Sequence, residues 1–381
     1  MGRLKIILSL FLTVINIAVS SQVKIRLFSN QSPESAVFSV TNGNYKICAF
    51  NRDSIVVSKG ESVFISRFDG KLVIKTRDSS GFISDSILFS SQTGNDSFSL
   101  RVNGSTPVRQ YYSGDLRCFP DLGTLVLVNT CDVEKYIAGV VKAEGGSGKN
   151  IEYFKSQAVI TRTYMYRYLI KHKSDGYNLC DNTHCQAFNG SSSDSILNKA
   201  ALETKGLVIL DHDSLLIISA FHSNCGGETA SSEDVWLSSQ TYLRKVVDPY
   251  CINSKNAIWQ KKFSVNEWME FITKSGYSGL TDDTSVFSFS QNSRMSDYQV
   301  GTFKIPLTTI RADMNLRSTF FSVVTEGDSV ILRGRGYGHG VGLCQEGAMV
   351  MASKGFNYME IIDFYYSGVM ISDIKNAVNL P

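Results

Sequence analysis

Glycine occupies every second position from Gly334 to Gly342, near the end of the 381-residue chain. The residues between these glycines are Arg335, Tyr337, His339 and Val341. Because successive side chains of a strand point to opposite faces, this spacing predicts an extended segment that is bare on one face. Glycine weakens a strand, so such a run suggests close approach by a ligand or by another backbone. We therefore expect this segment to be packed against a partner rather than left open.

The composition indicates a globular protein, with 43% hydrophobic and 19% charged residues. A formal net charge of +3 does not favour a nucleic acid as partner. From Gln22 to Arg117 the chain has short runs rich in Val, Ile and Phe, separated by turn residues. Helical patterns follow at Lys155–Leu169 and in three segments after residue 264, and "LLIISAF" reads as a strand. We predict an α+β fold with a β-rich region at 21–118 and a mixed region at 119–381, its helices packed on a sheet or a partial barrel.

The first twenty residues resemble a secretory signal. Arg3 and Lys5 precede an apolar run from Ile6 to Val19, and the small residues before the proposed cleavage point include Ala18 and Ser20. The alternative is an uncleaved membrane anchor, although the run is short for a span of about 20 residues. We expect an exported protein that resides in the periplasm, in the cell envelope or outside the cell.

Two histidines and two cysteines lie close together between residues 172 and 185: His172, Cys180, His184 and Cys185. Two imidazoles and two thiols are a sufficient donor set for a tetrahedral zinc ion. The spacing is not that of a standard zinc finger, and an exported protein can instead form disulfides. The residues alone therefore leave a zinc site and a Cys180–Cys185 disulfide as equal alternatives.

Glu144 follows an apolar stretch and precedes a glycine-rich segment. Burial at the edge of a cleft raises the pKa of a carboxyl group and makes it a proton donor near neutral pH. An ordinary surface glutamate is the competing interpretation, since glutamates are mostly exposed. A third cluster, His222, Ser223 and Cys225, lacks the signature that surrounds a catalytic serine or cysteine.

Several segments together resemble the SpoIID/LytB family, named for stage II sporulation protein D and the LytB amidase enhancer. The resemblance covers roughly Gly123 to Val369. Its elements, in the family order, are "VEKYIAGVVKAEGG" followed by "FKSQAVITRTYMYRY", then "CQAFNG", "AFHSNCGGETASSEDVW", "YLRKVVDPYC" and the glycine-rich segment from Arg333. The chain departs from the family pattern directly after Glu144, where "GGSGKNIEYF" replaces a proline-containing approach to the next helix.

This resemblance implies that residues 119–381 form the catalytic domain of a peptidoglycan lytic transglycosylase, a glycan-cleaving lyase. Such enzymes cut the MurNAc-β-1,4-GlcNAc bond and leave a 1,6-anhydro-MurNAc end, and sporulation members act on strands stripped of their peptides. Glu144 occupies the family's catalytic glutamate position. One carboxyl group suffices, because the C6 hydroxyl of the substrate attacks C1 with a large effective molarity, whereas hydrolysis by external water normally needs two carboxyl groups.

The motif match also implies roles for other residues. Residues expected to orient or contact the glycan are Gln157, Arg162, Gln186, Ser223, Gly226, Gly227, Thr229, Tyr337 and His339. His339 is expected to bond a sugar hydroxyl or to brace Glu144. Some family members hold a zinc ion near the catalytic helix, which favours one structural zinc at the His172 cluster, with no cofactor needed for the chemistry. Cys225 and Cys344 stand where relatives have small residues, as buried thiols or with Cys225 paired to Cys251.

Two other functions stay open at this point. The chain is also consistent with a protein that binds the wall without cutting it, or that assists a cell-wall amidase. A hydrolase that leaves a reducing end is the other option, with Glu228, Glu233 or Asp234 as its second carboxylate.

Overall fold

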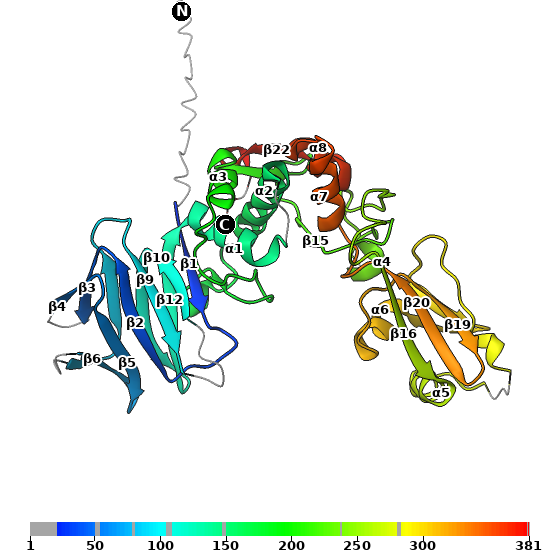
Figure 1. The fold of residues 1–381 in the computed structure, drawn as a ribbon, viewed down its shortest axis with the longest axis horizontal. Helices are drawn as coiled ribbons and strands as arrows, with labels where there is room; N and C mark the ends of the chain where they lie inside the picture. The colour runs from blue at the N-terminus through cyan, green and yellow to red at the C-terminus, as the bar shows by residue number, and fades with distance from the viewer. Residues whose placement is uncertain are drawn as a thin grey trace, which may run out of the picture.

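The computed structural model describes residues 21–49, 54–77, 81–103, 109–146, 150–236, 238–279, 283–378 and 380. The expected signal segment at residues 1–20 lies outside these residues. Among the helices of the described residues, none is both long and apolar enough to cross a bilayer. The fold is α+β, and its elements form three regions along the molecule (Figure 1).

The N-terminal region consists of two antiparallel sheets that pack face to face (Figure 1). The strands of the first sheet are, in spatial order, β13 (Leu179–Cys180), β1 (Gln22–Leu27), β12 (Thr124–Asp132), β11 (Asp115–Asp121), β8 (Ile87–Ser91), β3 (Asn44–Ala49) and β4 (Ser54–Ser58). Those of the second are β10 (Arg109–Ser113), β9 (Ser97–Val102), β2 (Ser35–Asn42), β5 (Ser62–Phe68), β6 (Lys71–Thr76) and β7 (Gly81–Ser84). Among the described strands of these two sheets, only β1 and β13 pair in parallel.

Aromatic side chains fill the space between these two sheets. Phe38 of the second sheet lies 4.3 Å from Phe89 of the first, measured between ring centroids. Tyr45 and Phe98 meet edge to face at 5.6 Å. The alternation of buried and exposed residues in β1, β2 and β5 produces this apolar inner face. The predicted β-rich region is confirmed, and its sheets continue beyond residue 118 through β12.

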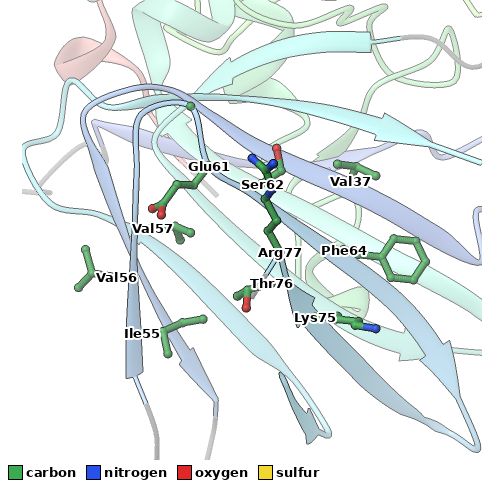
Figure 2. A pocket seen from close by; sticks show the side chains of 11 residues that line it. Val37, Ile55, Val56, Val57, Glu61, Ser62, Phe64, Lys75, Thr76 and Arg77 are labelled. Carbon is green, nitrogen blue, oxygen red and sulfur yellow. The ribbon is translucent and has the colours of Figure 1, made fainter. Parts of the chain in front are cut away.

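A cavity of about 710 Å³ opens in this N-terminal region, beside β4, β5 and β6 (Figure 2). Its walls combine Phe64, Lys75 and Arg77 with the side chains of β4. These strands lie at the end of the molecule away from the helices of the central region (Figure 1). The cavity is therefore separate from the segment that contains Glu144.

The central region is mainly helical and follows directly from β12 (Figure 1). Its helices are α1 (Val133–Glu144), α2 (Ile151–Arg167), α3 (Ser195–Glu203), α4 (Glu233–Trp236), α7 (Gln345–Ser353) and α8 (Tyr358–Tyr365), with 3-10 turns η1 (Lys173–Asp175) and η3 (Ile374–Asn376). Two strand pairs complete it: β14 (Leu207–Leu210) with β22 (Met370–Asp373), and β15 (Phe221–His222) with β21 (Leu343–Cys344). The side chain of Asp132 caps α1 by accepting from the backbone N–H groups of Glu134 and Lys135. Helix α2 is buried along most of its length and forms the centre of this region.

The third region has its own hydrophobic core. Its elements are β16 (Ile258–Ser264), α5 (Val265–Lys274), η2 (Thr284–Phe287), β17 (Asp297–Val300), β18 (Phe303–Pro306), α6 (Leu307–Asp313), β19 (Phe321–Glu326) and β20 (Ser329–Arg335). Trp268, Ile272, Tyr298 and Leu332 lie at the centre of this core. The predicted unit 119–381 thus contains two separately packed cores.

One predicted strand is wrong. "LLIISAF" is buried at Leu216, Ile217 and Ser219 and partly buried elsewhere, but apart from an isolated bridge at Leu216 its strand pairing is confined to Phe221, at its end. Other groups satisfy its polar atoms: the Ser219 hydroxyl donates to the Ile160 carbonyl oxygen at 2.9 Å, and the Ile218 N–H donates to the Tyr242 hydroxyl at 3.1 Å. A short apolar run can lie in a core without joining a sheet, and its periodicity does not reveal the difference.

The glycine run also differs from the predicted strand. Strand β20 ends at Arg335, and Gly336, Gly338, Gly340 and Gly342 all have φ between 70° and 114°. These are left-handed conformations that favour glycine. A Cβ atom on Gly336 would lie 2.6 Å from the Asn224 carbonyl oxygen, and one on Gly342 would lie 2.1 Å from that of Ala220. Close approach by another backbone is therefore confirmed, and the partner is the segment 220–226.

Candidate active site

Glu144 is the last residue of α1 and is half-buried. One of its carboxylate oxygens, Oε1, accepts a hydrogen bond from the Ala187 backbone N–H at 2.6 Å. The other oxygen has no hydrogen-bond partner among the described residues. The Gly145 carbonyl oxygen next to it accepts from the Tyr153 hydroxyl at 2.6 Å. The carboxyl group is thus held by one oxygen and leaves the second available.

Burial raises the pKa of Glu144 from 4.5 to about 7, while the hydrogen bond from Ala187 opposes this shift. Among the described residues, no charged side chain contributes to the shift. A carboxyl group with this pKa is protonated in a substantial fraction of molecules at neutral pH, which is the state that a general acid requires.

Three glutamine side chains surround the end of α1. Gln345, at the start of α7, donates from Nε2 to the Glu144 carbonyl oxygen at 2.7 Å and to Gln157 Oε1 at 3.3 Å. Gln186 accepts from the Tyr136 hydroxyl at 3.2 Å. The Nε2 atoms of Gln157 and Gln186 are buried and lack partners among the described residues. Buried amide groups without partners are costly, so these two N–H groups are candidate donors.

Gln157 and Gln186 were predicted from the sequence, whereas Gln345 and the Ala187 N–H were not. Gln345 follows the glycine run directly in "CQEGA", which was the available signal. The role of Ala187 is a backbone contact, and no side-chain pattern predicts it.

The His172 cluster directly precedes the turn at Ala187, whose backbone N–H contacts Glu144. The donor atoms of His172, Cys180, His184 and Cys185 all lie within 4.8 Å of one another. Cys180 Sγ is 3.6 Å from His184 Nδ1, and Cys185 Sγ is 3.5 Å from His172 Nε2. Both cysteines are free thiols.

These distances fit a tetrahedral zinc ion. Bonds of about 2.3 Å to sulfur and about 2.0 Å to nitrogen separate the two kinds of donor by about 3.5 Å. His172 Nδ1 lies 3.1 Å from an oxygen of Asp175, which is how a carboxylate orients a ligating imidazole. Cys185 is followed by Gln186 and Ala187, so the cluster fixes the turn from which Ala187 reaches Glu144.

The structure places Arg162 and Thr229 in the interior, away from any surface that a glycan can reach. Arg162 is 0% exposed and forms an ion pair with Glu134, and its Nη1 donates to the Leu207 carbonyl oxygen at 3.0 Å. Thr229 is 1% exposed, and its hydroxyl oxygen accepts from the Val246 N–H at 2.8 Å. Their expected contact with the substrate is therefore corrected: both hold packed segments together.

The glycine pair also has a structural explanation. A Cβ atom on Gly226 would lie 2.7 Å from Arg335 Cβ, so its bare side faces the protein and not a ligand. Gly227 has φ 99° and would meet Ile252 at 3.3 Å. Ser223 is partly exposed and is contacted by Asn256 Nδ2 at 3.3 Å. The expectation that the glycan lies on bare glycines is thus replaced by packing between two protein segments.

His339 has its ring nitrogens engaged by backbone. Its Nδ1 accepts from the Val341 N–H at 3.1 Å. Burial lowers the pKa of His339 to about 4, opposed by a hydrogen bond to the Phe221 backbone, so the ring is neutral at pH 7. No described contact joins His339 to Glu144. Tyr337 is 46% exposed, with Arg317 Cζ 5.8 Å from the centroid of its ring.

His339 borders an aromatic cleft that the sequence analysis did not identify. A cleft of about 320 Å³ is lined by Tyr168, Ile218, Trp236, Ser238 and Gln240. The rings of Trp236 and His339 are 5.3 Å apart. The ring of Tyr168, the residue after α2, lies 4.5 Å from that of Tyr164 one turn back, and the two rings are tilted by 46°.

Tyr164 of α2 is partly exposed and lies next to Tyr168 of this cleft. Burial raises the pKa of Tyr164 above its usual range, and the negative charges of Cys185, Tyr168, Cys180 and, least of these, Glu144 add to the shift.

The three other candidate acids are each engaged elsewhere. Glu228 accepts from the Arg294 N–H at 2.8 Å and forms an ion pair with Lys245 at 3.3 Å. Glu233 pairs with Arg244, and Asp234 accepts from the Ser296 hydroxyl at 3.1 Å. None of them influences the pKa of Glu144.

Comparison with known proteins matches this arrangement to one family. The model of the family described as SpoIID, stage II sporulation protein, matches residues 121–210, which include Glu144 and the His172 cluster. Stage II sporulation protein D of Bacillus subtilis is 29% identical, over 66% of this chain and 78% of its own length. These matches support the SpoIID/LytB family as the one that this chain resembles.

Two further relatives support membership of the SpoIID/LytB family. An uncharacterized protein of Brachyspira hyodysenteriae is 29% identical over 88% of this chain and 89% of its own length. The amidase enhancer of Bacillus subtilis is 27% identical over 62% of this chain and 40% of its own length.

Proposed function

We propose that this protein is an exported lytic transglycosylase that cleaves MurNAc-β-1,4-GlcNAc bonds of peptidoglycan and leaves 1,6-anhydro-MurNAc ends. The observation that carries the proposal is the state of Glu144, whose pKa is raised to about 7 and whose second oxygen is not engaged by any residue that the structure describes. No carboxylate of the described residues contributes to this pKa shift, which supports a reaction that needs one acid.

In this mechanism Glu144 acts twice. Its proton passes to the glycosidic oxygen as the bond from C1 of MurNAc to that oxygen breaks, which releases the GlcNAc hydroxyl. The C6 hydroxyl oxygen of the same MurNAc then bonds to C1, and its proton returns to the Glu144 carboxylate. No water is consumed and the enzyme is regenerated. The intramolecular attack replaces the second carboxyl group of a hydrolase.

The surroundings of Glu144 suggest how the glycan is held. Gln157 and Gln186 are each 2% exposed, so their unpartnered amide N–H groups are suited to donate to sugar oxygens only once substrate binding uncovers them. Tyr168 and Trp236, at the cleft beyond Tyr164, offer aromatic faces to the apolar C–H surfaces of sugars. In this arrangement the strand extends along α2 from Glu144 toward Trp236.

A structural zinc ion at His172, Cys180, His184 and Cys185 is part of the proposal. Four protein ligands leave no open coordination position, so the ion supplies folding stability and no chemistry. Its effect on catalysis is indirect, through the turn that presents the Ala187 N–H to Glu144.

A non-catalytic role is the second candidate, and the likeness to a protein named amidase enhancer favours it. In that role the chain binds wall glycan and raises the activity of a cell-wall amidase. Retention of Glu144 with a raised pKa is an observation that this role does not require.

Product analysis separates these functions. The purified protein is incubated with denuded glycan strands and with intact peptidoglycan, and the products are examined by mass spectrometry. We expect anhydro-MurNAc ends in the wild type and none in Glu144→Gln. Glu233→Gln is the matched control and is expected to keep full activity, because its carboxylate pairs with Arg244.

Three results would contradict the proposal. Labelled oxygen from water at the new end would indicate a hydrolase. Unchanged activity in Glu144→Gln would remove the assigned acid. Stimulation of an amidase by a protein that forms no products of its own would establish the enhancer role.

A further inference from the structure

A second cluster of metal-binding side chains lies away from Glu144 and the His172 cluster. It consists of Cys225, Asp248, Cys251 and Cys344, whose donor atoms all lie within 4.8 Å of one another. Cys225 follows β15, Cys251 lies in the loop before β16, and Cys344 ends β21. Three segments far apart in the sequence therefore meet at this point.

All four side chains are completely buried, with 0% exposure. Cys225 Sγ lies 3.2 Å from Cys251 Sγ and 3.2 Å from Asp248 Oδ2. The three cysteines are free thiols. A cluster of three sulfurs and one carboxylate in the interior places four groups that can carry negative charge next to one another. Such burial is costly unless a cation or protons compensate it.

The donor set matches the preference of zinc for thiolate, imidazole and carboxylate ligands in tetrahedral sites. Tetrahedral bonds to zinc separate neighbouring sulfur and oxygen donors by about 3.6–3.8 Å. The 3.2 Å contacts would need to lengthen by about 0.5 Å. A disulfide uses only two of the three thiols and does not explain why a buried carboxylate completes the group.

The surroundings also suit a negatively charged metal centre. Cys344 Sγ accepts from the Cys225 N–H at 3.3 Å and from the Gly347 N–H at 3.4 Å, which favours a thiolate. The buried guanidinium of Arg294 donates to the Cys225 carbonyl oxygen at 2.7 Å. Its positive charge therefore lies beside the cluster.

Hydrogen bonds from residues around the cluster orient its carboxylate, Asp248. Asp248 Oδ2 accepts from the Tyr365 hydroxyl at 3.0 Å, and Oδ1 accepts from the Tyr250 N–H at 2.8 Å. Such contacts fix a ligating carboxylate. A Cβ atom on Gly347 would lie 2.3 Å from Asp248 Oδ2, so the first turn of α7 packs directly on this group.

We propose that Cys225, Asp248, Cys251 and Cys344 bind a structural zinc ion, in addition to any ion at the His172 cluster. Through its ligands, the ion links the segment 220–226 and the loop at Cys251 to the start of α7. Residue 345, which contacts Glu144, follows Cys344 directly. The site therefore stabilises the packing that positions Gln345, and it does not depend on the proposed reaction.

The test is the zinc content of the purified full chain, measured by mass spectrometry of the metal after removal of loosely bound ions. Cys251→Ser is expected to lower the content by about one ion per chain relative to the wild type. His184→Ala tests the other cluster separately. Cys118→Ala is the matched control, because Cys118 is equally buried but lies in the N-terminal sheet, and it is expected to leave the content unchanged.

A second measurement covers the case in which Cys251→Ser does not fold. The wild type is unfolded in the presence of an alkylating reagent and weighed as an intact chain. Eight alkylated cysteines, with zinc release that occurs only on unfolding, support the site. A disulfide between Cys225 and Cys251, or unchanged zinc content in folded Cys251→Ser, would overturn the proposal.

Cobalt-loaded protein offers a third measurement. Loss of thiolate-to-cobalt absorption in Cys251→Ser would support the proposal.

Discussion

Two glutamates on helix α1 have opposite environments. Glu134, in the first turn, is 6% exposed and forms an ion pair with the fully buried Arg162. Glu144, at the other end, has no cationic partner in the part of the chain that the structure describes, and burial raises its pKa to about 7. A paired carboxylate holds helices together, whereas an unpaired one at a partly open position retains a proton that it can transfer. The two residues are of the same type, so their different environments explain why Glu134 has a structural role and Glu144 is the candidate acid.

The largest effect is expected from Glu144→Gln. The amide keeps the shape and can still accept the Ala187 N–H, but it cannot donate a proton to the leaving oxygen. We expect the rate of anhydro-MurNAc formation to fall by about 10²–10⁴-fold or below detection. Rates on denuded strands measure this, with circular dichroism to show that the fold is intact. A rate within twofold of wild type would mean that Glu144 does not transfer the proton, so that it would not differ from Glu134 in having a catalytic role.

Glu134→Gln is expected to lower the stability of the protein, whereas Glu144→Gln lowers the reaction rate. Removal of this partner leaves the Arg162 charge buried and unpaired, and we expect a loss of about 3–5 kcal/mol of stability. Denaturant unfolding measures this loss. The double variant Glu134→Leu/Arg162→Met should recover most of it, because no uncompensated charge remains. Equal stability of the single variant and the wild type would show that the ion pair is not needed.

Glu144→Gln should also increase stability at high pH. Because the folded-state pKa of about 7 lies above the ordinary value of 4.5, the ionised carboxyl is disfavoured in the folded protein. The cost is absent below pH 4.5, grows as the pH rises to 7 and is complete above it. We expect Glu144→Gln to gain about 1–3 kcal/mol at pH 8 after allowance for partial exposure, and little at pH 5. Thermal unfolding at the two pH values tests this, and a gain of equal size at both would exclude ionisation as the cause.

The smallest expected effect is the decline of the wild-type reaction rate as the pH rises. The first step requires protonated Glu144, so the rate should decline as the pH rises through about 7, by about tenfold per unit well above it. Initial rates from pH 5 to 9 measure this decline. Glu233→Gln should show the same profile, since the Glu233 carboxylate pairs with Arg244. A profile that is flat up to pH 9 would contradict the pKa assigned to Glu144.

Local patterns in the sequence predicted the strands of the N-terminal region and helix α2, but not every element of the fold. The alternating runs of the N-terminal region became strands, because the pleat places every second residue in the core. Helix α2 was predicted nearly at its true position. "LLIISAF" failed because its hydrogen bonds go to Ile160 and Tyr242, which no local pattern reveals.

The sequence by itself determined the α+β class, the family motifs, Glu144 and the adjacent His172 cluster, because these depend on residues close together in the chain. Only the tertiary structure decided that Arg162 is a buried ion-pair partner, that the glycines pack on residues 220–226, and that Cys225, Cys251 and Cys344 meet at Asp248. The physical reason is that burial, pKa and metal geometry arise from contacts between distant segments. Periodicity and spacing describe only neighbours along the chain.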